Sequence, residues 1–292
     1  MKKLLISVIM IMIFGLSANA QCNYTDFQCP QNYKTSSGFS KFMGSVTGAN
    51  FIARKAGESI IKKSIKNDAE GDFDVKLESF SAADLAAGRF KSLSITGKNI
   101  VSDDVYLSYL NLKTICDYNY IVLDKKNNTA TFKEDFGMTF GAVMTESDIN
   151  NSMQNKEYKY LIDEINSLGK SISLFNIQSA KVKIKNNKFM YVIKIAFPMF
   201  GMSKSVVITS DINVHNGRII FTQTNVMNDY VKMDLSKITY LLNYLNPLNF
   251  SLRILENKDA DMQIQEAVIK NDKIYVNGII TVDKDVVTEC KE

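Results

Sequence analysis

The sequence has a single histidine, three prolines, and no long apolar run after its first twenty residues. Histidine is the usual general acid or base at neutral pH, and His215 stands in an Asn-rich stretch typical of a solvated turn. Nucleophile-elbow, phosphate-loop, dinucleotide-binding and zinc-protease motifs are also missing. We therefore expect no enzyme, no catalytic residue, no cofactor and no metal site.

The first twenty residues have the form of a secretory signal peptide. Lys2 and Lys3 precede an apolar run from Leu4 to Leu16, and an A-x-A site ends at Ala20. The run is shorter than the roughly 20 apolar residues that span a bilayer, and an uncleaved anchor is the alternative. The pattern predicts that residues 1–20 are removed and that the protein is exported to the periplasm or cell envelope.

The charge balance gives no strong attraction to polyanions. The chain has 35 Lys+Arg and 31 Asp+Glu, and removal of Lys2 and Lys3 leaves 33 against 31. A net charge near +2 is not typical of nucleic-acid binding, and it predicts no strong electrostatic docking on anionic membranes. We therefore expect no nucleic-acid partner.

Four cysteines remain after the signal, and an even number in an exported chain favours disulfide bonds. Three pairings are possible. We favour Cys22–Cys29, which closes a small N-terminal loop, and Cys116–Cys290, which ties the C-terminus to a central strand.

Hydrophobic periodicity divides the rest of the chain into helical and extended parts. After an irregular, cysteine-bearing segment at 21–36, helical spacing predicts a helix over 37–66. Period-two alternation begins near residue 72. Helical spacing returns at 145–168, where Thr145 and Asp148 form a capping box, and at 235–244, a helix that Asn246-Pro247 should end. We expect residues 37–292 to form a single domain.

The C-terminal half repeats one hairpin signature three times. Asn186-Asn187, Asn216-Gly217 and Asn271-Asp272 each separate two strand-like runs, and these residues tolerate the positive φ of tight turns. The pattern predicts an α+β fold with long antiparallel strands.

An apolar loop joins two of these strands. It contains Phe197, Met199, Phe200 and Met202 beside a Pro and a Gly. An apolar loop either packs on the core or contacts lipid, and the sequence alone favours core packing.

The order of five short motifs resembles the LmeA-like phospholipid-binding family, formerly a domain of unknown function. The motifs extend over most of the region from 37 to 283, and they occur at 80–100, 105–112, 142–150, 196–208 and 246–248. The cysteine-bearing N-terminal segment departs from the family pattern.

The resemblance implies a long curved antiparallel sheet wrapped around a helix, as in the tubular lipid-binding superfamily. It also implies a phospholipid partner; the protein partner is unknown. With a lipid carrier in view, we also expect the apolar loop at Phe197, Met199, Phe200 and Met202 to bind lipid, as the lip of the channel that makes transient membrane contact. The residues expected to line an apolar channel lie on the inner sheet face and the 37–66 helix; they are Phe42, Val46, Phe73, Val75, Leu93, Ile95, Leu107, Val143, Ile193 and Ile195. The alternatives are a structural or assembly factor of the envelope with a filled core, and an envelope enzyme with an unrecognised carboxylate site.

Overall fold

The computed structural model describes residues 27–31, 33–124, 129–171, 176–227 and 235–289. The predicted signal peptide, Cys22 and Cys290 lie outside these ranges. In the described ranges, no helix is both long and apolar enough to cross a lipid bilayer.

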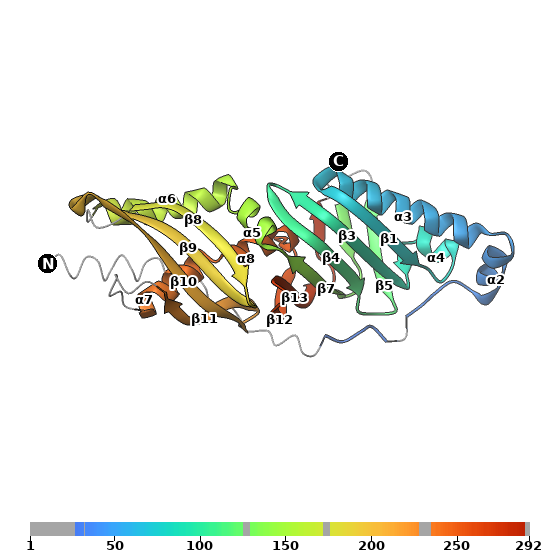
Figure 1. Cartoon of the computed structure of the whole chain (residues 1–292). Coiled ribbons are helices and arrows are strands. Elements are labelled where there is room, and N and C mark those ends of the chain that lie inside the picture. The colour runs from blue at the N-terminus through green and yellow to red at the C-terminus, as the bar shows by residue number, and fades with distance from the viewer. Residues whose placement is uncertain (1–26, 32, 125–128, 172–175, 228–234, 290–292) are drawn as a thin grey trace.

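The expected mixed α+β fold with antiparallel strands is confirmed. The strands form three sheets, ordered β1-β3-β4-β7-β13-β12, β11-β10-β9-β8 and β14-β6-β5-β2. The molecule is elongated, and the two larger sheets follow one another along its long axis (Figure 1). The strands are β1 (Glu70–Glu78), β2 (Arg89–Phe90), β3 (Ser92–Ser102), β4 (Val105–Thr114), β5 (Asn119–Asp124), β6 (Thr129–Phe132), β7 (Phe136–Met144), β8 (Asn176–Lys185), β9 (Lys188–Phe197), β10 (Met202–His215), β11 (Arg218–Val226), β12 (Asp261–Lys270), β13 (Lys273–Val282) and β14 (Val287–Glu289).

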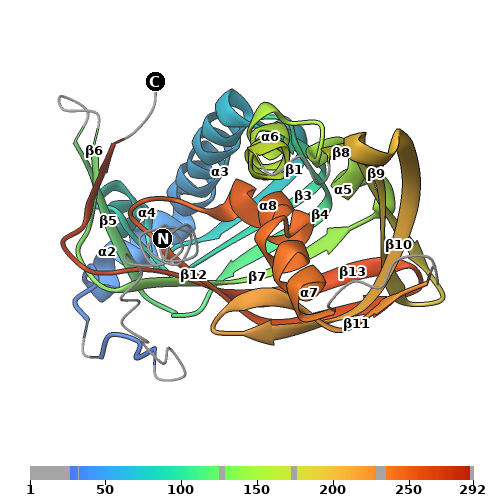
Figure 2. The same ribbon diagram turned by 90° about the vertical axis from the view of Figure 1, so that its left-hand side faces the viewer.

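Helices lie mainly on the inner side of the two larger sheets. Figure 2 shows α6, α7 and α8 within the curve of the strands, and α3 packs along β1 at the edge of the six-stranded sheet. The helices are α2 (Gly38–Val46), α3 (Ala49–Asp68), α4 (Ala82–Ala86), α5 (Glu146–Ser152), α6 (Lys156–Ser171), α7 (Leu235–Tyr244) and α8 (Pro247–Leu252), with short 3₁₀ turns η2 (Pro198–Phe200) and η3 (Arg253–Leu255).

The three repeated hairpins are confirmed as β8–β9, β10–β11 and β12–β13, each with positive φ at both turn residues. All three turns take part in hydrogen bonds that hold the larger sheets together. The backbone N–H of Asn187 donates to Asp272 Oδ1 (3.2 Å), and the carbonyl of Gly217 accepts a hydrogen bond from the Ile264 N–H (3.0 Å). The second sheet therefore abuts β12 and β13 of the first through its hairpin ends.

Two predicted helices are each broken in two. The expected 37–66 helix divides into α2 and α3 because Gly48 takes a left-handed φ of 73°, which ends one helix and starts the next. The expected 145–168 helix divides into α5 and α6, although its Thr145–Asp148 capping box is confirmed. Asn246-Pro247 ends α7 as expected, but Asn246 also caps α8, a helix that the sequence did not predict.

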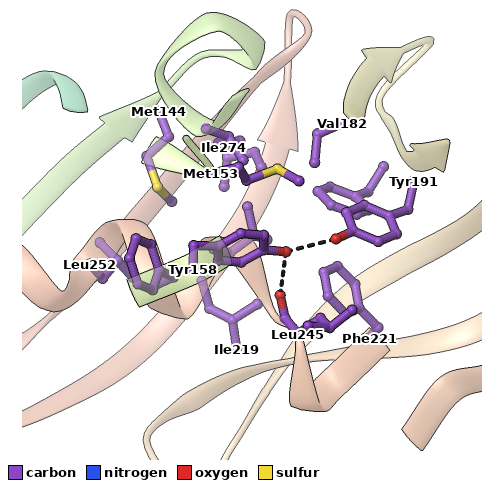
Figure 3. Close-up of a cluster of buried hydrophobic side chains, with 14 of the residues drawn as sticks. Met144, Met153, Tyr158, Val182, Tyr191, Ile219, Phe221, Leu245, Leu252 and Ile274 are labelled. Atoms are coloured by element: carbon purple, nitrogen blue, oxygen red, sulfur yellow. Dashed lines mark hydrogen bonds between the residues drawn. The ribbon is translucent and has the colours of Figure 1, made fainter. Parts of the chain in front are cut away.

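A single hydrophobic core extends through both larger sheets. At its centre Tyr158 of α6 and Tyr191 of β9 are fully buried among aliphatic side chains and Phe221 (Figure 3). Because each sheet alone would leave one apolar face open, this common core is what holds the elongated molecule together.

The N-terminal segment, residues 27–31 and 33–37, is fastened to the end of β4. A disulfide joins Cys29 to Cys116, the Tyr33 and Tyr118 rings stack with centroids 4.2 Å apart, and the Ser36 N–H donates to Asp84. Both favoured cysteine pairings are therefore wrong. The segment runs across the end of the sheet instead of folding back on itself, so Cys29 meets Cys116.

Candidate functional site

The inner face of the six-stranded sheet is apolar from edge to edge. Strand register places one row of side chains across all six strands, from Val75 on β1 to Ile264 on β12. Between them stand Ile95, Leu112, Phe140 and Gly278.

The rows on either side continue the apolar surface. One comprises Leu77, Leu93, Thr114, Met138, Ile280 and Met262, and the other comprises Phe73, Gly97, Leu110, Ala142, Val276 and Ala267. Thr114 is the one polar side chain in these rows, and its hydroxyl accepts a hydrogen bond from the Leu93 N–H (3.1 Å).

Helices cover this face unevenly. The main contacts of α3 are with β1, whereas α5 and α8 contact β4. Five apolar residues of the inner face remain only partly buried, and we call them the inner strip: Leu93, Ile95, Leu112, Met262 and Ile280. Ile95, Leu112, Met262 and Ile280 of the inner strip also pack against the hydrophobic core, so the strip is covered in part and exposed in part.

The predicted lining residues do not all come together. Leu93 and Ile95 lie in the inner strip, while Ile193 and Ile195 lie on the inner face of the other sheet. Five of the ten predicted residues are buried in the packed core, and they are Phe73, Val75, Leu107, Ile193 and Ile195.

Three of the predicted residues face elsewhere. Val143 pairs with Tyr109 and Tyr275 on the outer face of the sheet, because the strand alternates and its neighbour Ala142 points inward. Phe42 and Val46 are 63% and 67% exposed on α2, which the break at Gly48 directs away from the sheet.

Sequence reasoning missed Leu112, Met262 and Ile280 of the inner strip. A usable signal was present on β7, where Met138, Phe140, Ala142 and Met144 alternate and are all buried. That alternation assigns Val143 to the opposite face.

The surface hollows have mixed polar and apolar linings, and one of them reaches Met262 of the inner strip. One of about 650 Å³ lies beside α7, α8 and β12 and includes Arg218, Asn243 and Arg253 in its lining. Another of about 670 Å³ lies between the end of α3 and the β3–β4 turn. None of the predicted lining residues borders either hollow.

The apolar loop at 197–202 forms a tip between β9 and β10, at the end of the molecule opposite α2 (Figure 1). Met199 is 66% exposed and Met202 is 45% exposed, whereas Phe197 is partly buried against the core. The side chain of Phe200 lies outside the described part of the structure. The favoured core-packing interpretation is therefore wrong for both methionines.

Buried polar groups have structural partners. Burial raises the pKa of Tyr158 and of Tyr191, whose hydroxyl groups bond to each other. Burial alone would raise the pKa of Asp84, but hydrogen bonds from Ser36, Ser81 and Arg89 outweigh it and hold that pKa below its ordinary value. Among the described residues, no three His, Cys, Asp or Glu side chains gather where a metal ion could be held.

No family model, curated protein or solved structure matches the chain. The resemblance to the LmeA-like family therefore stays a prediction that rests on the five motifs.

Proposed function

We propose that this is an exported lipid-binding protein of the cell envelope, which shelters phospholipid acyl chains as a carrier or sensor. The observation that carries the proposal is the inner strip, where apolar side chains remain partly exposed on a sheet face that is otherwise buried. Exposed apolar surface of this kind marks a site where another apolar body binds. In this proposal the two larger sheets act together as a half-barrel of the tubular lipid-binding type.

The dimensions suit an acyl chain. Six strands separated by about 4.8 Å make an inner face about 24 Å wide across the strands. An acyl chain reaches about half of the roughly 30 Å hydrocarbon core of a bilayer, so it fits within this width. Each methylene removed from water contributes about 0.8 kcal/mol, so a chain of about 14 methylenes needs about 10 kcal/mol of apolar shelter.

The tip at Met199 and Met202 gives the proposed carrier a transient membrane contact. Both side chains are exposed, and methionine adapts to irregular apolar surroundings. The tip belongs to the second sheet and the inner strip to the first, so we assign the tip to membrane contact and the strip to acyl-chain binding.

The chain contains no tryptophan, which allows a direct test. We would introduce a single tryptophan by Leu112→Trp in the inner strip, with Val143→Trp on the outer face as the matched control. Both positions are partly exposed and lie on neighbouring strands. Phospholipids with brominated acyl chains quench tryptophan only at short range, so we expect quenching for Leu112→Trp and none for Val143→Trp.

Equal quenching at the two positions would contradict the proposal, and so would a lack of quenching in folded Leu112→Trp and Ile280→Trp proteins. Ile280→Trp, at the other side of the inner strip, is a second probe in case the tryptophan at position 112 itself blocks lipid binding. If all three variants stay folded and unquenched, the protein is better explained as a structural or assembly factor with a filled core.

A further inference from the structure

The α2 helix turns its apolar stripe to solvent. Phe42, Met43 and Val46 share one helix face and are 63%, 43% and 67% exposed. The opposite side faces the protein, where Lys41 Nζ donates to Thr35 Oγ1 (2.8 Å) and lies 5.8 Å from the centroid of the Phe80 ring. A surface helix normally buries its apolar stripe in the core, whereas no described part of the chain covers this one.

The next helix continues this apolar surface. None of the residues of α3 is buried, and Phe51 and Ile52, just after the break, are exposed. The protein side of α3 is held by close and polar contacts instead. Gly57 lets the helix approach Leu77, and the Glu58 carboxylate accepts a hydrogen bond from the Leu77 N–H (3.2 Å).

Positive charge is concentrated on the same two helices. Residues 38–68 contain six Lys or Arg and two Asp or Glu, a net charge of +4. The chain without its signal has 33 basic and 31 acidic residues, so the rest carries 27 against 29, a net charge of −2. Within the described structure, the exposed Lys62, Lys63 and Lys66 have no carboxylate at ion-pair distance. The net charge of the whole chain is therefore close to zero although the surface of α2 and α3 is basic.

We propose that the α2–α3 elbow, residues 38–68, is a docking surface for an anionic lipid bilayer. Helices that combine exposed apolar residues with lysines lie in the interface of anionic membranes. The α2 part of the elbow lies at one end of the long axis and α3 runs back from it along β1 (Figure 1), and a bilayer can accept such a shape without a matching pocket. A second copy is a poorer partner because it would bring two surfaces of net charge +4 together.

The inference rests on the proposed function, because it gives the proposed carrier a second membrane contact at the end of the molecule opposite the tip. Its physical basis is nevertheless separate, since no residue of the inner strip belongs to the elbow. The two ideas can therefore fail independently.

The test is flotation of protein, purified after export through its own signal, with phosphatidylcholine vesicles and with vesicles that also contain phosphatidylglycerol. The double variant Phe42→Ser, Val46→Ser should lower the bound fraction on anionic vesicles about tenfold or more. The matched control is Tyr160→Ser, Val268→Ser, which removes two exposed apolar side chains from α6 and β12 and should bind like the wild type. Thermal unfolding of both variants should match the wild type.

The contribution of the lysines of α3 to vesicle binding is tested with the triple variant Lys62→Glu, Lys63→Glu, Lys66→Glu. Its control is Lys181→Glu, Lys183→Glu, Lys185→Glu on the exposed side of β8. We expect the first variant alone to lose binding to anionic vesicles, and wild-type binding to weaken as salt is added.

Unchanged flotation of the folded Phe42→Ser, Val46→Ser variant would overturn the inference. Light scattering that shows a wild-type dimer and a monomeric variant would also overturn it, in favour of self-association. Lipid content, measured on the same samples, separates the two proposals. If the wild type binds vesicles through the elbow but carries no lipid, only the carrier function is disproved. If the protein carries lipid but the Phe42→Ser, Val46→Ser variant floats like the wild type, only the docking surface is disproved.

Discussion

The hydroxyl oxygens of Tyr158 and Tyr191 lie 2.7 Å apart in the core that joins the two larger sheets (Figure 3). The Tyr158 oxygen also lies 2.7 Å from the Leu245 carbonyl. Since a carbonyl only accepts, Tyr158 donates to Leu245 and Tyr191 donates to Tyr158. The chain of two hydrogen bonds ties α6, β9 and the end of α7 together.

This order of donors makes the two tyrosines unequal. Tyr191→Phe removes one donor and leaves the Tyr158–Leu245 bond intact, so we expect a loss of about 1 kcal/mol in the free energy of unfolding. Tyr158→Phe leaves both the Leu245 carbonyl and the Tyr191 hydroxyl unpaired in the core, and we expect a loss of about 2–3 kcal/mol. Denaturant unfolding measures both values, and equal losses would show that the assigned donor order is wrong.

The Cys29–Cys116 disulfide should contribute to stability because it closes a long loop. The cysteines are 87 residues apart, and loops of that length correspond to about 3–5 kcal/mol in the chain-entropy account. Reductant should lower the unfolding midpoint of the wild type. The variant Cys29→Ser, Cys116→Ser should unfold at the same midpoint as the reduced wild type, because it lacks this disulfide under all conditions.

Peptide mapping without reduction checks the same pairing directly. A cross-linked peptide containing Cys29 and Cys116 is expected. A peptide that joins Cys22 to Cys29 would contradict the structure.

Asp84 should make stability depend on pH. Its pKa is depressed in the folded protein, so the carboxylate stabilises the fold above its ordinary pKa, and this contribution is lost as the pH falls through the folded value. At pH 7 we expect Asp84→Asn to cost about 2–3 kcal/mol, because the buried carboxylate accepts hydrogen bonds from Ser36, Ser81 and Arg89.

The difference between wild type and Asp84→Asn should begin to shrink below about pH 4, where the carboxylate of the unfolded wild type becomes protonated, and should vanish as the pH falls through the lower pKa of the folded state. Asp74→Asn is the control because Asp74 is exposed on β1, and it should change stability by less than about 0.5 kcal/mol. A difference for Asp84→Asn that stays constant from neutral to acid pH would contradict this explanation.

The tip is tested by Met199→Ser, Met202→Ser. Both side chains are exposed, so the free energy of unfolding should change by less than about 0.5 kcal/mol. Uptake of a fluorescent phospholipid from donor vesicles should nevertheless slow. Leu123→Ser, at a position 62% exposed on β5, is the control and should leave uptake unchanged. A large loss of stability in the Met199→Ser, Met202→Ser variant would show that the tip belongs to the core. Unchanged lipid uptake would show that the tip has no role in membrane contact.

Local patterns predicted the elements well where the signal is short-range. The Asn-rich turns, the Thr145 capping box and the alternation on β1 each depend on a few neighbouring residues, and the structure contains all three. Helix breaks were missed because helical spacing continues through Gly48. Glycine adopts the left-handed conformation readily, so Gly48 was the local signal of the break, but the helical spacing on either side of it outweighed that signal.

Pairings between distant segments were the least predictable part. The Cys29–Cys116 bond depends on the path of the N-terminal segment across the end of the sheet. The outward direction of Phe42 likewise depends on which side of α2 faces α4. Phe42 and Val46 have the spacing of core residues, so spacing alone could not separate a buried stripe from an exposed one.

Lipid binding is the central claim, and the most direct measurement is native mass spectrometry of the exported protein, followed by extraction and identification of any bound molecule. We expect a bound phospholipid in a fixed ratio to protein, which is released on unfolding. A fully folded protein whose mass is that of the polypeptide alone, and which takes up no phospholipid from vesicles, would rule out lipid binding.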